Sequence, residues 1–87
     1  MRGLLGRRDL PRNEGILLKP AASIHTAFMR FPIDAVFLDR DLVVVGIAAH
    51  LRPWRAAARK GANSVLELAD GESSRRGLRV GDRLVTA

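Results

Sequence analysis

Cysteine is absent from all 87 residues of this sequence, and that absence excludes several kinds of chemistry at once. Without thiols there is no disulfide framework, thiolate zinc site, iron–sulfur cluster or cysteine nucleophile. The core must therefore hold the fold without cross-links, which this length allows, because only folds below about 40 residues generally need metals or disulfides. No repeat or flexible linker indicates a second unit, so residues 1–87 are expected to form a single domain.

Long hydrophobic runs are also missing. The longest internal run, residues 42–51, has about half of the ~20 residues that a membrane-spanning helix needs. Near the start, residues 3–6 form an apolar segment that is far shorter than the ~7 to 15 residue core of a secretory signal. The sequence therefore predicts a cytoplasmic protein with no membrane partner.

Acidic residues are fewer than basic ones, with 9 Asp and Glu against 15 Lys and Arg, and the net charge is +6. Arginine supplies 13 of the basic residues, and with 12 Ala this fits biased codon usage as well as an anion-binding surface. Clusters that converge in the fold would form a face that attracts anions. The clusters are Arg2, Arg7, Arg8 and Arg12; Arg52, Arg55, Arg59 and Lys60; and Arg75, Arg76, Arg79 and Arg83.

Aromatic side chains are scarce, with three Phe, one Trp and no Tyr. Proteins that read nucleic acids usually combine basic residues with stacking aromatics or a recognisable module. The sequence therefore predicts no specific nucleic-acid partner and keeps weak, sequence-independent binding through the Arg clusters as a second alternative function. Trp54, which follows Pro53, is interpreted as a lid over the core rather than a stacking platform, because few other large aromatics could fill that role.

Short apolar segments separated by Pro, Gly and Asp predict a series of strands. The run at 42–49 contains three consecutive valines and is interpreted as a central strand buried on both faces, with Gly46 marking a bulge. Just before it, Asp39-Arg40-Asp41 predicts a hairpin turn. The other predicted strands cover residues 15–18, 23–30, 33–39, 64–69 and 82–86.

Helical signals are few and brief. Residues 56–58 are three alanines that favour a helical turn capped by Gly61, and residues 72–76 predict a short helix that ends at Gly77. Short strands with brief turns and little helix predict a mainly β fold (β-rich α+β). We expect a compact, mostly antiparallel barrel or sandwich of short strands with one or two short helices.

Three polar side chains stand in apolar, strand-like segments: His25, Asp34 and Glu67. A buried carboxylate is costly unless it is paired or hydrogen-bonded. In the structural interpretation, which we favour, Asp34 accepts backbone N–H bonds at the turn after Pro32, and Glu67 pairs with an arginine at a sheet edge. In the functional interpretation, the three side chains line a cleft as an acid/base group, and Arg30 binds an anionic ligand.

The sequence gives little support for metal binding, for nucleophilic catalysis by serine or for a cofactor. His25 and His50 lie on separate predicted strands and lack the spacing of a metal motif, so no metal site is predicted. No serine stands in a Gly-x-Ser-x-Gly elbow, which is typical of many hydrolases. We also predict no cofactor.

An ordered series of motifs runs along nearly the whole chain. Its most specific part is His25-Thr26 followed by Met29-Arg30-Phe31-Pro32-Ile33-Asp34. The other motifs are Arg2-Gly3-Leu4-Leu5-Gly6, Glu14-Gly15-Ile16-Leu17-Leu18, Phe37-Leu38-Asp39, Val65-Leu66-Glu67-Leu68, Gly71 and Gly81-Asp82.

This series resembles the domain-of-unknown-function family 192. The resemblance implies a small, mostly antiparallel β-fold from prokaryotes with no established biochemical activity. Among the motif residues, Asp34, Glu67, Gly71, Gly81 and Asp82 are interpreted as structural. Many relatives carry Cys shortly before the His-Thr pair, where this chain has Ala21 or Ala22, so any thiol function there is lost.

Two classes of function fit these observations. The leading one is a non-catalytic binding or accessory module, expected to be monomeric, that holds a small anionic ligand or a peptide of a protein partner. Its pocket is expected near His25, Thr26, Met29 and Arg30. The alternative is a small enzyme that uses His25 with Asp34 or Glu67 as acid and base, and the sequence leans against it. A cleft that brings those side chains within hydrogen-bond reach would favour the enzyme.

Overall fold

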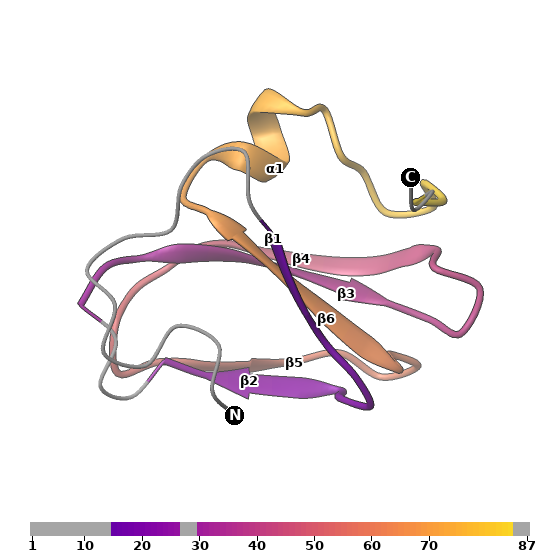
Figure 1. The fold of residues 1–87 in the computed structure, drawn as a ribbon, viewed down its shortest axis with the longest axis horizontal. Coiled ribbons are helices and arrows are strands. Elements are labelled where there is room, and N and C mark those ends of the chain that lie inside the picture. The colour runs from indigo at the N-terminus through magenta and orange to yellow at the C-terminus, as the bar shows by residue number, and fades with distance from the viewer. Residues whose placement is uncertain (1–14, 27–29, 85–87) are drawn as a thin grey trace.

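The computed structural model describes residues 15–26 and 30–84, and its strands form two separate sheets (Figure 1). The larger sheet has four strands in the order β1-β6-β3-β4, and the smaller sheet pairs β2 with β5. Every pairing between these strands is antiparallel. The elements are β1 (Gly15–Leu18), β2 (Ser23–His25), β3 (Ile33–Leu38), β4 (Val44–Leu51), β5 (Ala56–Ala58), β6 (Ser64–Ala69) and α1 (Glu72–Arg75).

The two central strands of the larger sheet, β3 and β6, have both faces covered. On one face, Phe37 and Val65 pack with Ile24 of β2, so the smaller sheet covers this side. Since both faces are occupied, every residue of β3 is buried. The opposite face holds a second apolar cluster, made of Val36, Leu38, Val44 and Leu68 with Leu78 and Leu84 from the segment after α1.

Several sequence predictions are confirmed. The strands at 15–18 and 64–69 have the predicted bounds, and the helix α1 is followed by Gly77, which has a φ of 66°. The hairpin between β3 and β4 also forms, and Asp39 Oδ1 stabilises its turn by accepting N–H bonds from Asp41 at 2.8 Å and Val43 at 3.0 Å. Of the strand predicted at 23–30, β2 covers 23–25, and residues 27–29 lie outside the described part of the chain.

The prediction of a central strand over 42–49 is wrong, because β4 is an edge strand of the larger sheet. Its apolar run is explained by the C-terminal segment, which covers that edge. Val44 N–H donates to the Asp82 carbonyl at 2.7 Å, and Gly81 N–H donates to the Val44 carbonyl at 2.8 Å. Asp82 also accepts an N–H bond from Arg79 at 2.9 Å, and Gly81 supplies the positive φ of 99° that the turn requires.

The predicted bulge at Gly46 is confirmed, since the β3–β4 register shifts between Phe37 and Leu38. The glycine is also needed for space, because a Cβ there would lie 2.6 Å from the side chain of Arg59. The Arg59 guanidinium lies over the ring of Phe37, 5.3 Å from its centroid. Close approach of this arginine therefore explains why Gly46 stands inside a strand.

The prediction of a helical turn at the three alanines is wrong. Ala56–Ala58 forms β5, with Ala57 opposite Ile24 of β2. Helix propensity is a weak preference of a few tenths of a kcal/mol per residue, and pairing with a distant strand overrides it.

The predicted fold class is confirmed: the chain folds into mostly antiparallel short strands with one short helix in the described residues. The strands stay in two sheets that pack face to face, and they do not close into the barrel that was the other option. Within residues 15–26 and 30–84, no helix is long and apolar enough to cross a membrane.

Candidate functional site

Thr26, of the His-Thr motif, is fully buried and organises a turn that is distant in sequence. Its hydroxyl donates to the Arg52 carbonyl at 2.6 Å and accepts the Arg55 N–H at 2.8 Å. Its backbone N–H donates to the Arg55 carbonyl at 2.7 Å, and its carbonyl accepts the Trp54 N–H at 3.1 Å. One threonine therefore fixes both ends of the turn at 52–55.

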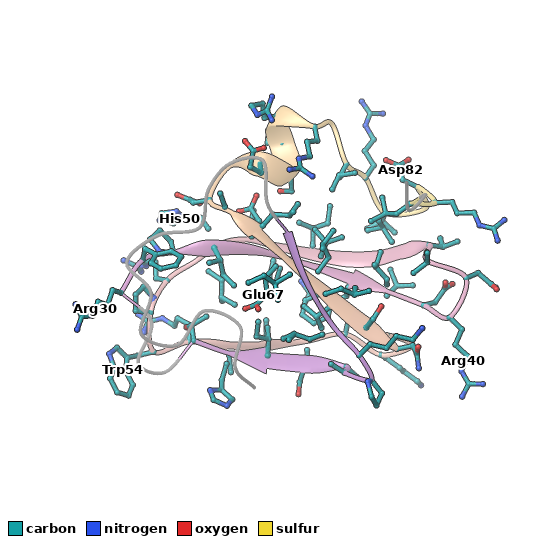
Figure 2. All side chains as sticks on the ribbon, viewed as in Figure 1. Arg30, Arg40, His50, Trp54, Glu67 and Asp82 are labelled. Carbon is teal, nitrogen blue, oxygen red and sulfur yellow. The ribbon has the colours of Figure 1, made fainter. Side chains whose placement is uncertain are left out.

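Trp54 lies in this turn with its side chain directed outward (Figure 2). It has a φ of 63° and is 62% exposed, so the interpretation of Trp54 as a lid over the core is wrong. The physical reason is that the hydrogen bonds to Thr26 fix the backbone in a left-handed conformation that presents the indole to solvent. A non-glycine residue in this conformation costs of order 1 kcal/mol or more and needs such support.

Three exposed arginines stand at the same end of the molecule as Trp54. Arg52 and Arg55 belong to the turn itself. Arg30 precedes β3, and the pairing of Ile33 with Leu51 directs residues 30 and 54 toward the same end of the sheet, as Figure 2 shows. We call the exposed side chains of Arg30, Arg52, Trp54 and Arg55 the Trp54 surface.

We expect the substitution Thr26→Val to lower the free energy of unfolding by about 1–3 kcal/mol, because it leaves the partly buried Arg55 N–H and Arg52 carbonyl without their partner. Urea denaturation measures the loss, and hydrogen exchange at the amides of Trp54 and Arg55 should become faster. Ser23→Ala removes an exposed hydroxyl from β2, the strand just before Thr26, and should change stability by less than about 0.5 kcal/mol. A Thr26→Val variant with parental stability and exchange would contradict this role.

Asp34 is fully buried and makes all its hydrogen bonds on the face of the sheet that carries α1. Its Oδ1 accepts the His50 N–H at 3.0 Å, and its Oδ2 accepts the Ser73 N–H at 2.8 Å and the Ser73 hydroxyl at 2.5 Å. Burial alone would raise the pKa of this carboxyl, but the hydrogen bonds from His50, Ser73 and Gly71 outweigh it and hold the pKa below its usual value. Asp34 does accept backbone N–H bonds, but the donors are His50 and Ser73, which are distant in sequence, and not the turn after Pro32 that the sequence indicated.

His50 is a site residue whose role the sequence did not reveal. It has a φ of 52° at a bulge in β4, and Asp34 accepts its backbone N–H. Its ring Nδ1 lies 3.0 Å from both carboxylate oxygens of Asp70, and the side chain is 61% exposed. Asp70 stands 20 residues away in sequence, so no local pattern could have indicated the pair.

Glu67 is fully buried on the other face of the sheet, opposite Ile16 of β1 and Ala35 of β3. Figure 2 shows its carboxyl group between the two sheets. Neither carboxyl oxygen has a hydrogen-bond partner in the part of the chain that the structure describes, so the predicted pairing with an arginine is not found there. Burial raises the pKa of Glu67 from 4.5 to about 7.

The described side chains do not bring the predicted acid/base residues together. Along β3, Asp34 stands opposite Leu68 and its neighbour Ala35 opposite Glu67, so the two carboxyl groups point to opposite faces. His25 is exposed on β2, in the other sheet, beside a shallow hollow. Met29 lies outside the described residues. The hollow is lined by Ser23, Ile24, His25, Ala56, Ala57 and Ala58.

Two arginines of the third basic cluster are engaged within the protein. Arg75 donates to the buried carboxylate of Glu72 at 2.6 and 2.7 Å, and Arg76 donates to it at 3.3 Å. These bonds raise the pKa of Arg75. Two of the four arginines of this cluster therefore compensate the charge of a buried carboxylate, and an anion-binding face at the cluster stays a prediction.

Comparison with known proteins agrees with the motifs and the fold. A family model named DUF192 and described as "Uncharacterized ACR" matches residues 1–86. No curated protein gives a significant match.

Two solved structures are similar over 94% of this chain. A protein of unknown function from Novosphingobium aromaticivorans is 30% identical with a TM-score of 0.84, and this chain spans 64% of its length. A proposed transcription regulator from Sinorhizobium meliloti is 25% identical with a TM-score of 0.85, and 69% of its length is covered. Because the family model covers nearly the whole sequence, the chain belongs to the DUF192 family of uncharacterised proteins.

Proposed function

We propose that this protein is a non-catalytic binding module that takes an anionic ligand at the Trp54 surface. The observation that carries the proposal is the turn at 52–55, which is fixed by Thr26 and presents an exposed indole between two exposed arginines. Rigid aromatic and guanidinium groups on a fixed backbone lose little conformational entropy when a ligand binds, so they are frequent centres of binding energy.

Charge and neighbouring features support an anionic ligand. The net charge of +6 attracts anions, and the four residues of the turn include no carboxylate. The hollow beside His25 adjoins this surface, because β5 starts directly after Arg55. In this proposal His25 and Arg30 contact the ligand, whereas Thr26 is a positioning residue. The regulatory name of the Sinorhizobium relative is also compatible with binding rather than catalysis.

The acid/base alternative stays a prediction with less geometric support. It requires His25 to approach Asp34 or Glu67, and the described structure holds these side chains on different sheets or faces. The pair of His50 and Asp70 resembles the carboxylate–imidazole arrangement of general bases, but three well-formed hollows in the described part of the chain are lined by other residues. Binding is therefore the function that this geometry supports best.

A nuclear magnetic resonance titration of the amide signals with inorganic tripolyphosphate tests this proposal. We expect the largest shifts at Arg30 and at residues 52–56. Arg52→Ala should weaken binding by several-fold, or about 1 kcal/mol, as for one partly exposed charge contact. The matched control is Arg40→Ala, which removes an exposed arginine from the hairpin at the opposite end (Figure 2). Shifts centred on residues 75–83, or equal effects of the two variants, would contradict the proposed surface.

A further inference from the structure

We infer that the Trp54 surface binds single-stranded nucleic acid, with a base stacked on the indole and the neighbouring phosphates held by arginines. This inference rests on the proposed function and names its ligand. It gives a role to an aromatic side chain that the sequence had assigned to the core. It also differs from the alternative in which nucleic acid binds weakly to several Arg clusters, because it assigns the binding to one defined surface.

The exposure of Trp54 indicates a stacking role. Large aromatic side chains usually bury much of their area, yet this one is 62% exposed. Its left-handed backbone is maintained by the buried Thr26, which directly follows β2 and is distant in sequence, so the exposure is built into the fold. Stacking of a base on such an exposed ring strengthens binding and tolerates any sequence, because every base has a flat π face.

The arginines beside Trp54 suit a phosphate backbone. Arg55 Nη1 donates to the carbonyl of Trp54 at 3.3 Å, which holds this guanidinium close to the turn. Arg52 lies on the other side of Trp54 in the chain, and Arg30 extends from the same end of the sheet. A base stacked on the indole would therefore have guanidinium groups on more than one side. These groups would be close to the phosphates that flank the base in a nucleic-acid strand.

The open shape of the surface favours a strand over a small molecule. Three well-formed hollows among the described residues are lined by residues other than Trp54, Arg52 and Arg30, so none of these three would enclose a mononucleotide at this surface. A nucleic-acid strand that crosses the surface can make several weak contacts and does not need a pocket. Duplex DNA is less suited, because its bases are stacked on one another and cannot reach the indole. An acidic peptide supplies the charge but not the flat ring.

The intrinsic fluorescence of the protein provides a direct test, because Trp54 is its only tryptophan and it has no tyrosine. We expect a thymidine strand of about 15 nucleotides, which is near the upper range of single-strand site sizes, to quench this fluorescence at low salt. An abasic strand of equal length and charge should bind about tenfold more weakly. A duplex of the same length should also bind more weakly and should quench little.

Substitutions separate the stacking from the charge contribution. In fluorescence anisotropy with a labelled strand, Trp54→Ala should weaken binding by about tenfold, whereas Trp54→Phe keeps a stacking face and most of the affinity. Replacing both Arg52 and Arg55 by Ala should flatten the dependence of affinity on salt by about 1.4 in logarithmic slope. Arg40→Ala is the matched control at the far end and should leave the affinity of the strand nearly unchanged, and thermal melts should show that all variants fold.

The outcomes distinguish this inference from the proposed function. Equal affinity for the thymidine and abasic strands, with no effect of Trp54→Ala, would overturn the stacking and leave only anion binding at the surface. Tighter binding of duplex than of single strand would overturn it as well. If neither strand binds and tripolyphosphate still shifts residues 52–56, the nucleic-acid inference fails and the proposed function stands. If tripolyphosphate shifts none of these residues either, both fail.

Discussion

The free energy of unfolding should fall by up to about 3 kcal/mol as the pH rises from about 4.5 to above 7, because Glu67 ionises inside the fold. Burial raises the pKa of this carboxyl from 4.5 to about 7. Below pH 4.5 the group is neutral in both states. Between pH 4.5 and 7 only the folded state keeps the proton, so stability falls with pH. Above pH 7 the folded state carries a charge without solvent, and the loss is complete.

The surroundings of Glu67 explain the size of this effect. Its neighbours across the sheet are Ile16 and Ala35, which supply no hydrogen bond from their side chains. Arg59 also lies on this side of the sheet, over Phe37, but its guanidinium donates to the carbonyls of Ala58 at 2.8 Å and Ile47 at 3.4 Å. A carboxylate here therefore loses its hydration without an ion pair that the described residues provide.

The variant Glu67→Gln isolates this contribution, because the amide has nearly the same shape and does not ionise. Urea unfolding at a series of pH values between 4 and 8.5, about the range in which the charge changes, should show a flatter profile for the variant. Above pH 7 the variant should be the more stable protein. The difference between the two profiles is the quantity to compare, because contributions that both proteins share cancel in it. A constant difference across the range would show that Glu67 does not ionise with a raised pKa.

Local patterns in the sequence were sufficient to predict many of the strands and turns of the fold. The strands at 15–18 and 64–69, the hairpin after β3 and the helix before Gly77 all depend on neighbouring residues, so their signals are present in short windows. The position of β4 was not predictable in this way, because an apolar strand at an edge looks like a central one when a later segment covers it.

The candidate site was predicted in part. Asp34 and Glu67 were identified as buried from their apolar neighbours, but their surroundings depend on residues that are far away in sequence. Asp34 bonds Ser73, which is 39 residues further on, and the Thr26 hydroxyl reaches Arg52 across 26 residues. The exposure of Trp54 depends on that second contact. Local composition does not reveal such long-range contacts. The sequence alone therefore could not show that Trp54 is exposed rather than a lid over the core.

Removing the carboxylate of Asp34 should destabilise the protein more than removing the hydroxyl of Thr26. We expect Asp34→Ala to lower the free energy of unfolding by about 3–5 kcal/mol, because it removes the acceptor of the His50 and Ser73 N–H groups and of the Ser73 hydroxyl. Ser73→Ala removes only the hydroxyl bond and should cost about 1 kcal/mol. Asp41→Ala removes an exposed carboxylate in the hairpin and should change stability by less than about 0.5 kcal/mol.

The pH dependence of the Asp34 variant distinguishes a structural anchor from a functional carboxylate. Because the folded pKa of Asp34 lies below 3.8, its contribution is present above that value and is lost as the pH falls through the folded pKa. Loss of stability in acid should therefore be weaker in Asp34→Ala than in the parent, while the decline due to Glu67 toward pH 7 persists. Hydrogen exchange at His50 and Ser73 should accelerate, since the same carboxylate holds the bulge and α1 on the sheet. An Asp34→Ala protein that unfolds like its parent, with these amides still protected, would show that Asp34 does not anchor them.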